Sequence, residues 1–157
     1  MLFGKKDSLV GLDIGSRSVK VAEIVDSKSG PKLKRFGMAD MPMGAIEDGA
    51  ISDPATAAET IRQLFKASSI RESNVAVSIG GYSVIVKKIN VQTMPEKQLQ
   101  ETIHFEAEQY IPFDISDVNL DFQILGENEN NPSQMSVFLV AAKKEMVNDY
   151  INLVTMA

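Results

Sequence analysis

Two apolar segments near the N-terminus flank a short cluster of residues whose types suit phosphate binding. Residues 9–14 form an apolar run that includes Asp13, and residues 19–25 are rich in β-branched side chains. Both segments have the pattern of strands. Residues 15–18, with the sequence Gly-Ser-Arg-Ser, are too few to do more than reverse the chain, so we expect an antiparallel hairpin. Lys20 follows this connection closely.

The residue types in this hairpin favour an anion as the ligand. Gly15 lacks a Cβ, so the backbone can turn sharply there and approach a ligand closely. Consecutive N–H groups from Gly15 to Ser18 can form an anion-binding concavity, to which the Ser16 and Ser18 hydroxyls add donors. Lys20 alternates with two valines and can point towards a bound phosphate. Asp13 is costly in an apolar strand without a partner, and a hydrated Mg²⁺ would supply one.

A plainer hairpin is the alternative interpretation. In it Asp13 hydrogen-bonds the turn and Lys20 faces solvent, because a short pattern such as D-x-G-x-x-x-x-K also arises by chance. Two features favour the phosphate interpretation: an apolar strand leads directly into Asp13, and a second strand begins directly after Ser18. Because strand leads to strand rather than to helix, the pattern is neither a P-loop nor a dinucleotide-binding fingerprint.

Composition excludes several other kinds of site. The chain has 157 residues, no cysteine and one histidine, His104, which excludes disulfides, zinc–thiolate sites and thiol catalysis. The formal net charge is -5, so the chain lacks the clustered positive charge of a nucleic-acid binder. A short basic cluster, Lys32, Lys34 and Arg35, is typical of a solvated strand face.

The sequence predicts no segment that would cross or be carried across a membrane. No stretch approaches the roughly 18 consecutive apolar residues of a membrane-spanning helix. The N-terminal residues 1–6 are too short for a signal peptide and lack a cleavage site. We therefore expect a cytoplasmic protein that does not insert into a membrane, although a membrane-bound partner is compatible with the sequence.

The remaining pattern predicts two α/β parts. We expect a short flexible segment at 1–7, a first domain at 8–81 and a second at 82–157. In the first, a strand near 33–39 precedes a Pro/Gly-rich passage at 41–49, a helix at 54–67 and a strand at 75–79. The second has the order strand, helix, strand, strand, helix, and its elements are expected at 84–91, 93–111, 118–125, 135–142 and from 147 onwards. The last helical pattern runs to Ala157 without a stop signal, as expected for part of a longer chain.

The segment from Asp13 to Lys20 resembles the first phosphate motif of actin-like ATPases, specifically of the PilM family of type IV pilus assembly proteins. Three further segments are similar to that family and follow in its order: 2–6 (LFGKK), 106–113 (EAEQYIPF) and 140–145 (VAAKKE). Together they extend over most of the chain and are more specific than the phosphate motif alone.

The resemblance implies a fold and a binding site. The fold is an α/β fold with an actin-like (ribonuclease H-like) first subdomain to about Gly80, followed by an inserted βαββα subdomain like that of the division protein FtsA. The second half of the fold, with the adenosine-binding residues, would follow Ala157. ATP with Mg²⁺ is the implied ligand, Asp13 holding the metal through water. The residues implied to bind nucleotide phosphate are Asp13, Gly15, Ser16, Arg17, Ser18 and Lys20.

The resemblance also implies a role. The implied role is that of a cytoplasmic adaptor at the inner membrane. It would bind the cytoplasmic N-terminal peptide of a PilN-like protein in a groove between the two subdomains, and it would also contact other pilus assembly proteins. The groove residues and the oligomeric state are left open, and so is ATP hydrolysis. We expect no activity from this chain, because only one wall of the cleft is present. A small-molecule kinase and an FtsA-like division protein are the alternatives.

Overall fold

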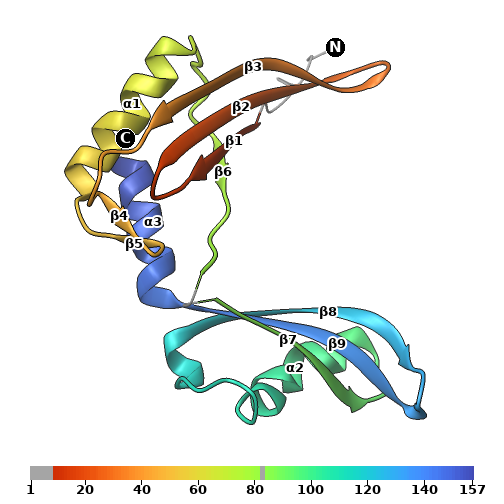
Figure 1. The fold of residues 1–157 in the computed structure, drawn as a ribbon. Coiled ribbons are helices and arrows are strands. Elements are labelled where there is room, and N and C mark those ends of the chain that lie inside the picture. Colours follow the sequence, from red (N-terminus) through yellow and green to blue (C-terminus); the bar gives the residue numbers. More distant parts are fainter. Residues whose placement is uncertain (1–8, 82–83) are drawn as a thin grey trace. The chain divides into compact units, whose positions relative to one another are not determined.

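The computed structural model describes residues 9–81 and 84–157, which belong to two compact units (Figure 1). The first unit comprises Met1–Ile79 and Asp149–Ala157, and the second comprises Gly80–Asn148. The boundary near residue 80 lies close to the expected one. The C-terminal residues differ from the expectation, because they lie with the first unit rather than the second. The expected flexible segment at 1–7 lies outside the described residues.

The first unit is built on a four-stranded sheet with the strand order β3-β2-β1-β6. Its strands are β1 (Leu9–Ile14), β2 (Ser18–Ser27), β3 (Gly30–Asp40) and β6 (Val75–Val77). β2 pairs antiparallel with both β1 and β3, whereas β6 pairs parallel with β1. The expected order of three strands, a helix and a strand is present, and the β1–β2 hairpin forms where the sequence predicts it.

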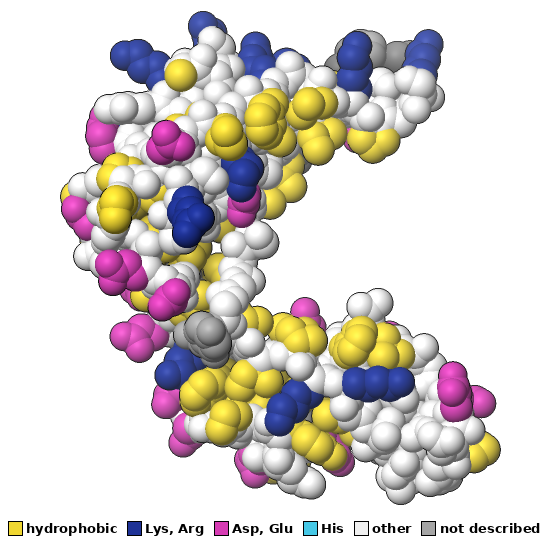
Figure 2. All heavy atoms as spheres, viewed as in Figure 1, with side chains coloured by type: hydrophobic (Ala, Val, Ile, Leu, Met, Phe, Trp, Pro, Cys, Tyr) yellow, Lys and Arg dark blue, Asp and Glu magenta, His cyan; other side chains and the backbone are white. Residues whose placement is uncertain are grey.

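The two faces of this sheet differ in burial. Side chains of β1 and β2 alternate, so Val10, Leu12, Val19 and Val21 are buried on one face. The other face exposes large apolar side chains, which Figure 2 shows gathered over these strands. They are Leu9, Ile24, Leu33, Phe36 and Met38. Asp13 and Lys20 pair with each other in register and alternate with the buried residues of their strands, so both lie on this second face.

Helix α1 (Pro54–Ala67) covers the buried face. Asp53 caps its N-terminus: its carboxylate accepts from the Thr56 backbone N–H at 3.0 Å, and Pro54 occupies the first turn. The helix lies close to β3 at Gly37, where an added Cβ would come within 2.0 Å of the Ser68 hydroxyl oxygen. The absence of a side chain at that position therefore allows the helix and the strand to approach.

The passage at 41–49 leads into a small hairpin that was not predicted from the sequence. β4 (Ile46–Glu47) and β5 (Ala50–Ile51) pair across Asp48 and Gly49, whose φ angles of 49° and 85° are both left-handed. Asp-Gly is the typical sequence of such a turn. Gly49 also accepts a hydrogen bond, at 3.1 Å, from the Tyr150 hydroxyl of helix α3 (Lys144–Met156). That bond and the buried Tyr150 and Leu153 explain why the C-terminal residues lie with the first unit.

The second unit has the expected strand, helix, strand, strand order and leads into α3. Its elements are β7 (Val84–Gln92), α2 (Glu96–Ala107), the 3₁₀ turn η1 (Ile115–Asp117), β8 (Val118–Asn128) and β9 (Asn131–Lys143). The strands form an antiparallel sheet in the order β7-β9-β8. Apolar residues of α2, led by Leu99, Ile103 and Ala107, share one core with the sheet residues Ile89 and Val137.

Helix α2 is shorter than the sequence predicts at both ends. The expected capping box with Thr93 is absent: Pro95 is the N-cap residue and makes no side-chain hydrogen bond. The helix ends at Ala107 instead of Ile111, because the N–H groups of Tyr110 and Ile111 both bond the Ala107 carbonyl and close a turn. Pro112 favours this outcome, since it disfavours the helical conformation in the residue before it.

Candidate functional site

The connection between β1 and β2 is a tight two-residue bend. Ile14 pairs with Val19, and the Gly15 N–H donates to the Ser18 carbonyl oxygen at 3.0 Å, which leaves Ser16 and Arg17 at the tip. An added Cβ at Gly15 would lie 3.1 Å from that same oxygen, closer than most real contacts. The close approach of the two strands at this bend therefore favours a residue without a Cβ.

The backbone donors of this bend are fewer than the sequence suggests. The Gly15 N–H is used within the hairpin, so it does not point to a ligand as the sequence analysis expected. The Arg17 carbonyl accepts from the Met41 N–H at 3.0 Å, which fixes the bend against the end of β3. Among the described residues, no backbone acceptor pairs with the N–H groups of Ser16 and Arg17. These two amides remain available to an anion.

The side chains of Asp13 and Lys20 lie together on the helix-free face of the sheet. The Lys20 Nζ donates to the Asp13 Oδ2 at 2.7 Å, and the two side chains are 42% and 59% exposed, respectively. Asp13 thus finds its partner in Lys20 rather than in the turn. An ion pair this exposed contributes at most about 1 kcal/mol, so exchanging either partner for a ligand costs little.

A shallow hollow of about 430 Å³ adjoins this ion pair. Asp13 and Lys20 line it together with apolar or small residues of the same sheet face, namely Gly11, Ala22, Phe36 and Ala76. Asp13 and Lys20 therefore meet at one open hollow, whereas Arg17 does not line it. Ser16 and Arg17 are exposed at the hairpin tip, and Ser18 is half-buried where it pairs with Asp40.

These groups fit a phosphate accompanied by magnesium. Lys20 is a point-charge donor for phosphate oxygens, and the Ser16 and Arg17 amides add neutral donors. Asp13 is a single carboxylate, which suits a metal that keeps most of its waters. The structure brings Asp13 and Lys20 together as a site requires, but it removes Gly15 from the expected donors.

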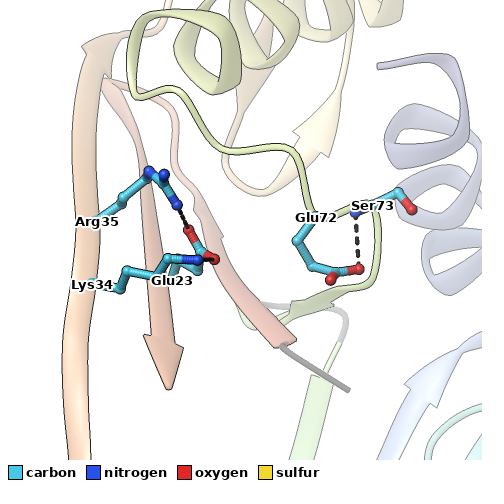
Figure 3. Close-up of polar contacts among 5 residues, drawn as sticks. All are labelled: Glu23, Lys34, Arg35, Glu72 and Ser73. Carbon is cyan, nitrogen blue, oxygen red and sulfur yellow. Dashed lines mark hydrogen bonds and ion pairs between the residues drawn. The ribbon is translucent and has the colours of Figure 1, made fainter. Parts of the chain in front are cut away.

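A second charged group lies on the same sheet (Figure 3). Glu23 is 3% exposed, and its two carboxylate oxygens each accept at 2.6 Å, one from Lys34 and one from Arg35. The β2–β3 register shifts next to Glu23, so two consecutive β3 residues oppose one residue of β2. These hydrogen bonds, from Lys34 first and then Arg35, lower the pKa of Glu23. Lys34 and Arg35 remain 44% and 36% exposed, as expected for a solvated strand face, but both also pair with Glu23, which the sequence did not predict.

Comparison with known proteins assigns the chain to a family. The family model described as type IV pilus assembly protein PilM matches residues 11–157. A solved structure described as a PilM–PilN type IV pilus biogenesis complex is similar with a TM-score of 0.83 and 31% sequence identity. That match covers 95% of this chain and 44% of the solved chain, so this chain spans less than half the length of that relative.

A more distant similarity shows the fold alone. The cytoplasmic domain of EpsL, an inner membrane component of the type II secretion system of Vibrio cholerae, matches with a TM-score of 0.55 and 10% identity. The match covers 94% of this chain and 52% of that domain. Within the described residues, no helix has the length and apolar character needed to cross a membrane.

Proposed function

This chain belongs to the PilM family of type IV pilus assembly proteins, and from that premise we propose that it is a cytoplasmic, ATP-binding adaptor of the pilus assembly machine. The expected actin-like α/β fold is confirmed by the match to solved PilM. The observation that carries the ATP proposal is the Asp13–Lys20 pair beside an open hollow, next to a bend with two available amides.

In this proposal the hairpin binds the phosphates of the nucleotide. Lys20 and the Ser16 and Arg17 amides donate to phosphate oxygens, while Asp13 orients a hydrated Mg²⁺. The metal would neutralise phosphate charge. Transfer of a phosphoryl group needs positioning from more than one side, so we propose that this chain holds nucleotide without hydrolysing it.

We propose the cytoplasmic N-terminal peptide of a PilN-like inner-membrane protein as the partner. The support is family membership and the similar solved structure, whose description names PilN together with PilM. An extended peptide gains main-chain hydrogen bonds at a strand and specificity from side-chain pockets. Such a contact would also place the chain at the inner membrane through a protein.

A peptide titration tests the partner. The chain is titrated with the N-terminal peptide of the PilN protein of the same genome, and a scrambled peptide of equal composition is the control. We expect saturable binding of the native sequence alone. Equal binding of both peptides, or no binding at millimolar peptide, would contradict the adaptor proposal.

A further inference from the structure

The second unit has a long sheet edge with which no described strand pairs. β7 is the outer strand of the order β7-β9-β8, and all nine of its residues, Val84–Gln92, pair with β9 in one unbroken register. The opposite edge strand, β8, has two register irregularities, at Ile124/Gly126 and Glu127/Asn128. Irregularities of this kind hinder the addition of another strand, whereas a regular edge presents a row of unpaired backbone groups. β7 is therefore the edge that can accept one.

The outer strand β7 carries two adjacent lysines beside exposed apolar side chains. Lys87 and Lys88 are adjacent near the centre of β7, so they point to opposite faces of the sheet. Val86, on the same face as Lys88, is 61% exposed, and Phe138, the β9 residue opposite Lys88, is 40% exposed. Figure 2 shows lysine and apolar side chains side by side in this part of the second unit.

The charge of this edge is opposite to the net charge of the second unit. The second unit, residues 80–148, holds five lysines against ten aspartates and glutamates. Among the described residues, neither Lys87 nor Lys88 has an ion-pair partner. A positive edge on an acidic unit selects partners with local negative charge.

A second copy of the chain does not suit this edge. If two β7 strands paired antiparallel about their centres, the lysines of one strand would lie beside those of the other. Like charges directly opposite each other in a sheet are destabilising, and edge lysines are a common protection against self-pairing. The same lysines leave the edge open to a strand with complementary charge.

We infer that the outer edge of β7 binds an extended segment of a protein partner in which two adjacent carboxylates follow or precede an apolar residue. The partner would add a fourth strand, its backbone pairing with β7. The residue beside Val86 would be apolar, and the residues beside Lys87 and Lys88 would be acidic, one on each face. This surface lies in the second unit and is independent of the nucleotide proposal.

A designed peptide tests the inference. The probe has nine residues, with two adjacent glutamates next to a valine and threonines elsewhere; a second probe carries lysines in place of the glutamates. Both are titrated into the isotope-labelled chain. We expect saturable binding of the acidic probe, with backbone amides of β7 becoming more protected from hydrogen exchange, and no binding of the basic probe.

Charge reversal of the edge supplies the matched variants. The double variant Lys87→Glu/Lys88→Glu should bind the acidic probe with an affinity lower by roughly tenfold or more. It should also gain binding of the basic probe, because the charges of the cross-strand pairs are reversed. Lys97→Glu makes the same kind of charge change at an exposed position of α2 and should leave both affinities unchanged.

Three results would overturn the inference. The first is the absence of binding by the acidic probe at millimolar concentration. The second is an equal loss of affinity in Lys97→Glu, which would indicate attraction by net charge alone. The third is binding that changes amide protection elsewhere and leaves β7 unaffected.

Discussion

At the residue scale, the hairpin combines two opposite charges that neutralise each other in the structure. Asp13 and Lys20 lie opposite each other in register, and both remain substantially exposed. A bound phosphate would compete with Asp13 for Lys20, and a metal would compete with Lys20 for Asp13. Nucleotide and magnesium should therefore be favoured together, since each compensates the group that the other displaces.

The sequence predicted that Asp13 and Lys20 belong to one site but not that they form an ion pair with each other. Alternation along two strands was enough to place Asp13 and Lys20 on one face. The use of the Gly15 N–H inside the bend depends on hairpin geometry that residue types do not specify. The contact of Lys34 and Arg35 with Glu23 depends on a register shift, which no local pattern marks.

The ion pairs of Glu23 predict how the thermal stability of the chain depends on pH. Its pKa is lowered in the folded state, so ionised Glu23 stabilises the fold. This contribution to the free energy of unfolding is complete above the ordinary glutamate pKa of about 4.3 and is lost as pH falls through the lowered value. Glu23→Gln should lower the melting temperature at pH 7, and the difference from the unmodified chain should shrink below pH 4. Thermal melts from pH 3 to 7 measure this.

Glu129→Gln, in the exposed β8–β9 turn, controls for the loss of one negative charge. A difference between Glu23→Gln and the unmodified chain that stays constant across that pH range would contradict the role assigned to the ion pairs.

At the element scale, most segments follow from periodicity and capping. α1 begins and ends as predicted, because Asp53, Pro54 and an apolar stripe mark it locally. The β4–β5 hairpin was missed although its Asp48-Gly49 turn carries the sequence signal, since two-residue strands have no readable alternation. The early end of α2 is set by a turn at Tyr110 that the apolar stripe, running on to Ile111, concealed.

Gly37 tests the contact between α1 and the sheet. Gly37→Ala would place a Cβ 2.0 Å from the Ser68 hydroxyl oxygen and 2.9 Å from a Leu64 methyl, so these side chains must rotate or the helix must move away from the strand. We expect a loss of about 1–3 kcal/mol in the free energy of unfolding, measured by urea denaturation.

The matched control is Gly11→Ala in the neighbouring part of the sheet, where the nearest atom to an added Cβ is 3.9 Å away. It should change stability little. Equal effects of the two substitutions would show that the close helix–strand approach at Gly37 is not the cause.

At the scale of the whole molecule, the sequence predicted two α/β parts and the order of their elements. It placed residues 149–157 in the wrong unit, because the assignment rests on long-range contacts such as Tyr150 with Gly49. The length of the solved relative, of which this chain spans 44%, also lay outside what any local pattern determines.

The core of the second unit should depend on Leu99, which is fully buried between α2 and the sheet. Leu99→Ala is expected to cost about 2–5 kcal/mol, because it removes buried apolar contacts and leaves a cavity. Hydrogen exchange of the β7 and β9 amides measures the loss of protection. Phe105→Ala on the same helix, at a side chain 71% exposed, should change stability by less than about 0.5 kcal/mol. Equal protection in both variants would contradict the described core.

The most direct test of the account is a titration of the isotope-labelled chain with Mg²⁺ and ATP, followed by the backbone amide resonances. We predict saturable shifts centred on Ser16, Arg17 and their neighbours, and an affinity roughly tenfold weaker in Lys20→Ala, which loses a charged donor. Lys28→Ala, at the exposed β2–β3 turn, should bind as the unmodified chain does. Shifts confined to residues away from the hairpin, or an affinity unchanged by Lys20→Ala, would contradict nucleotide binding at this site.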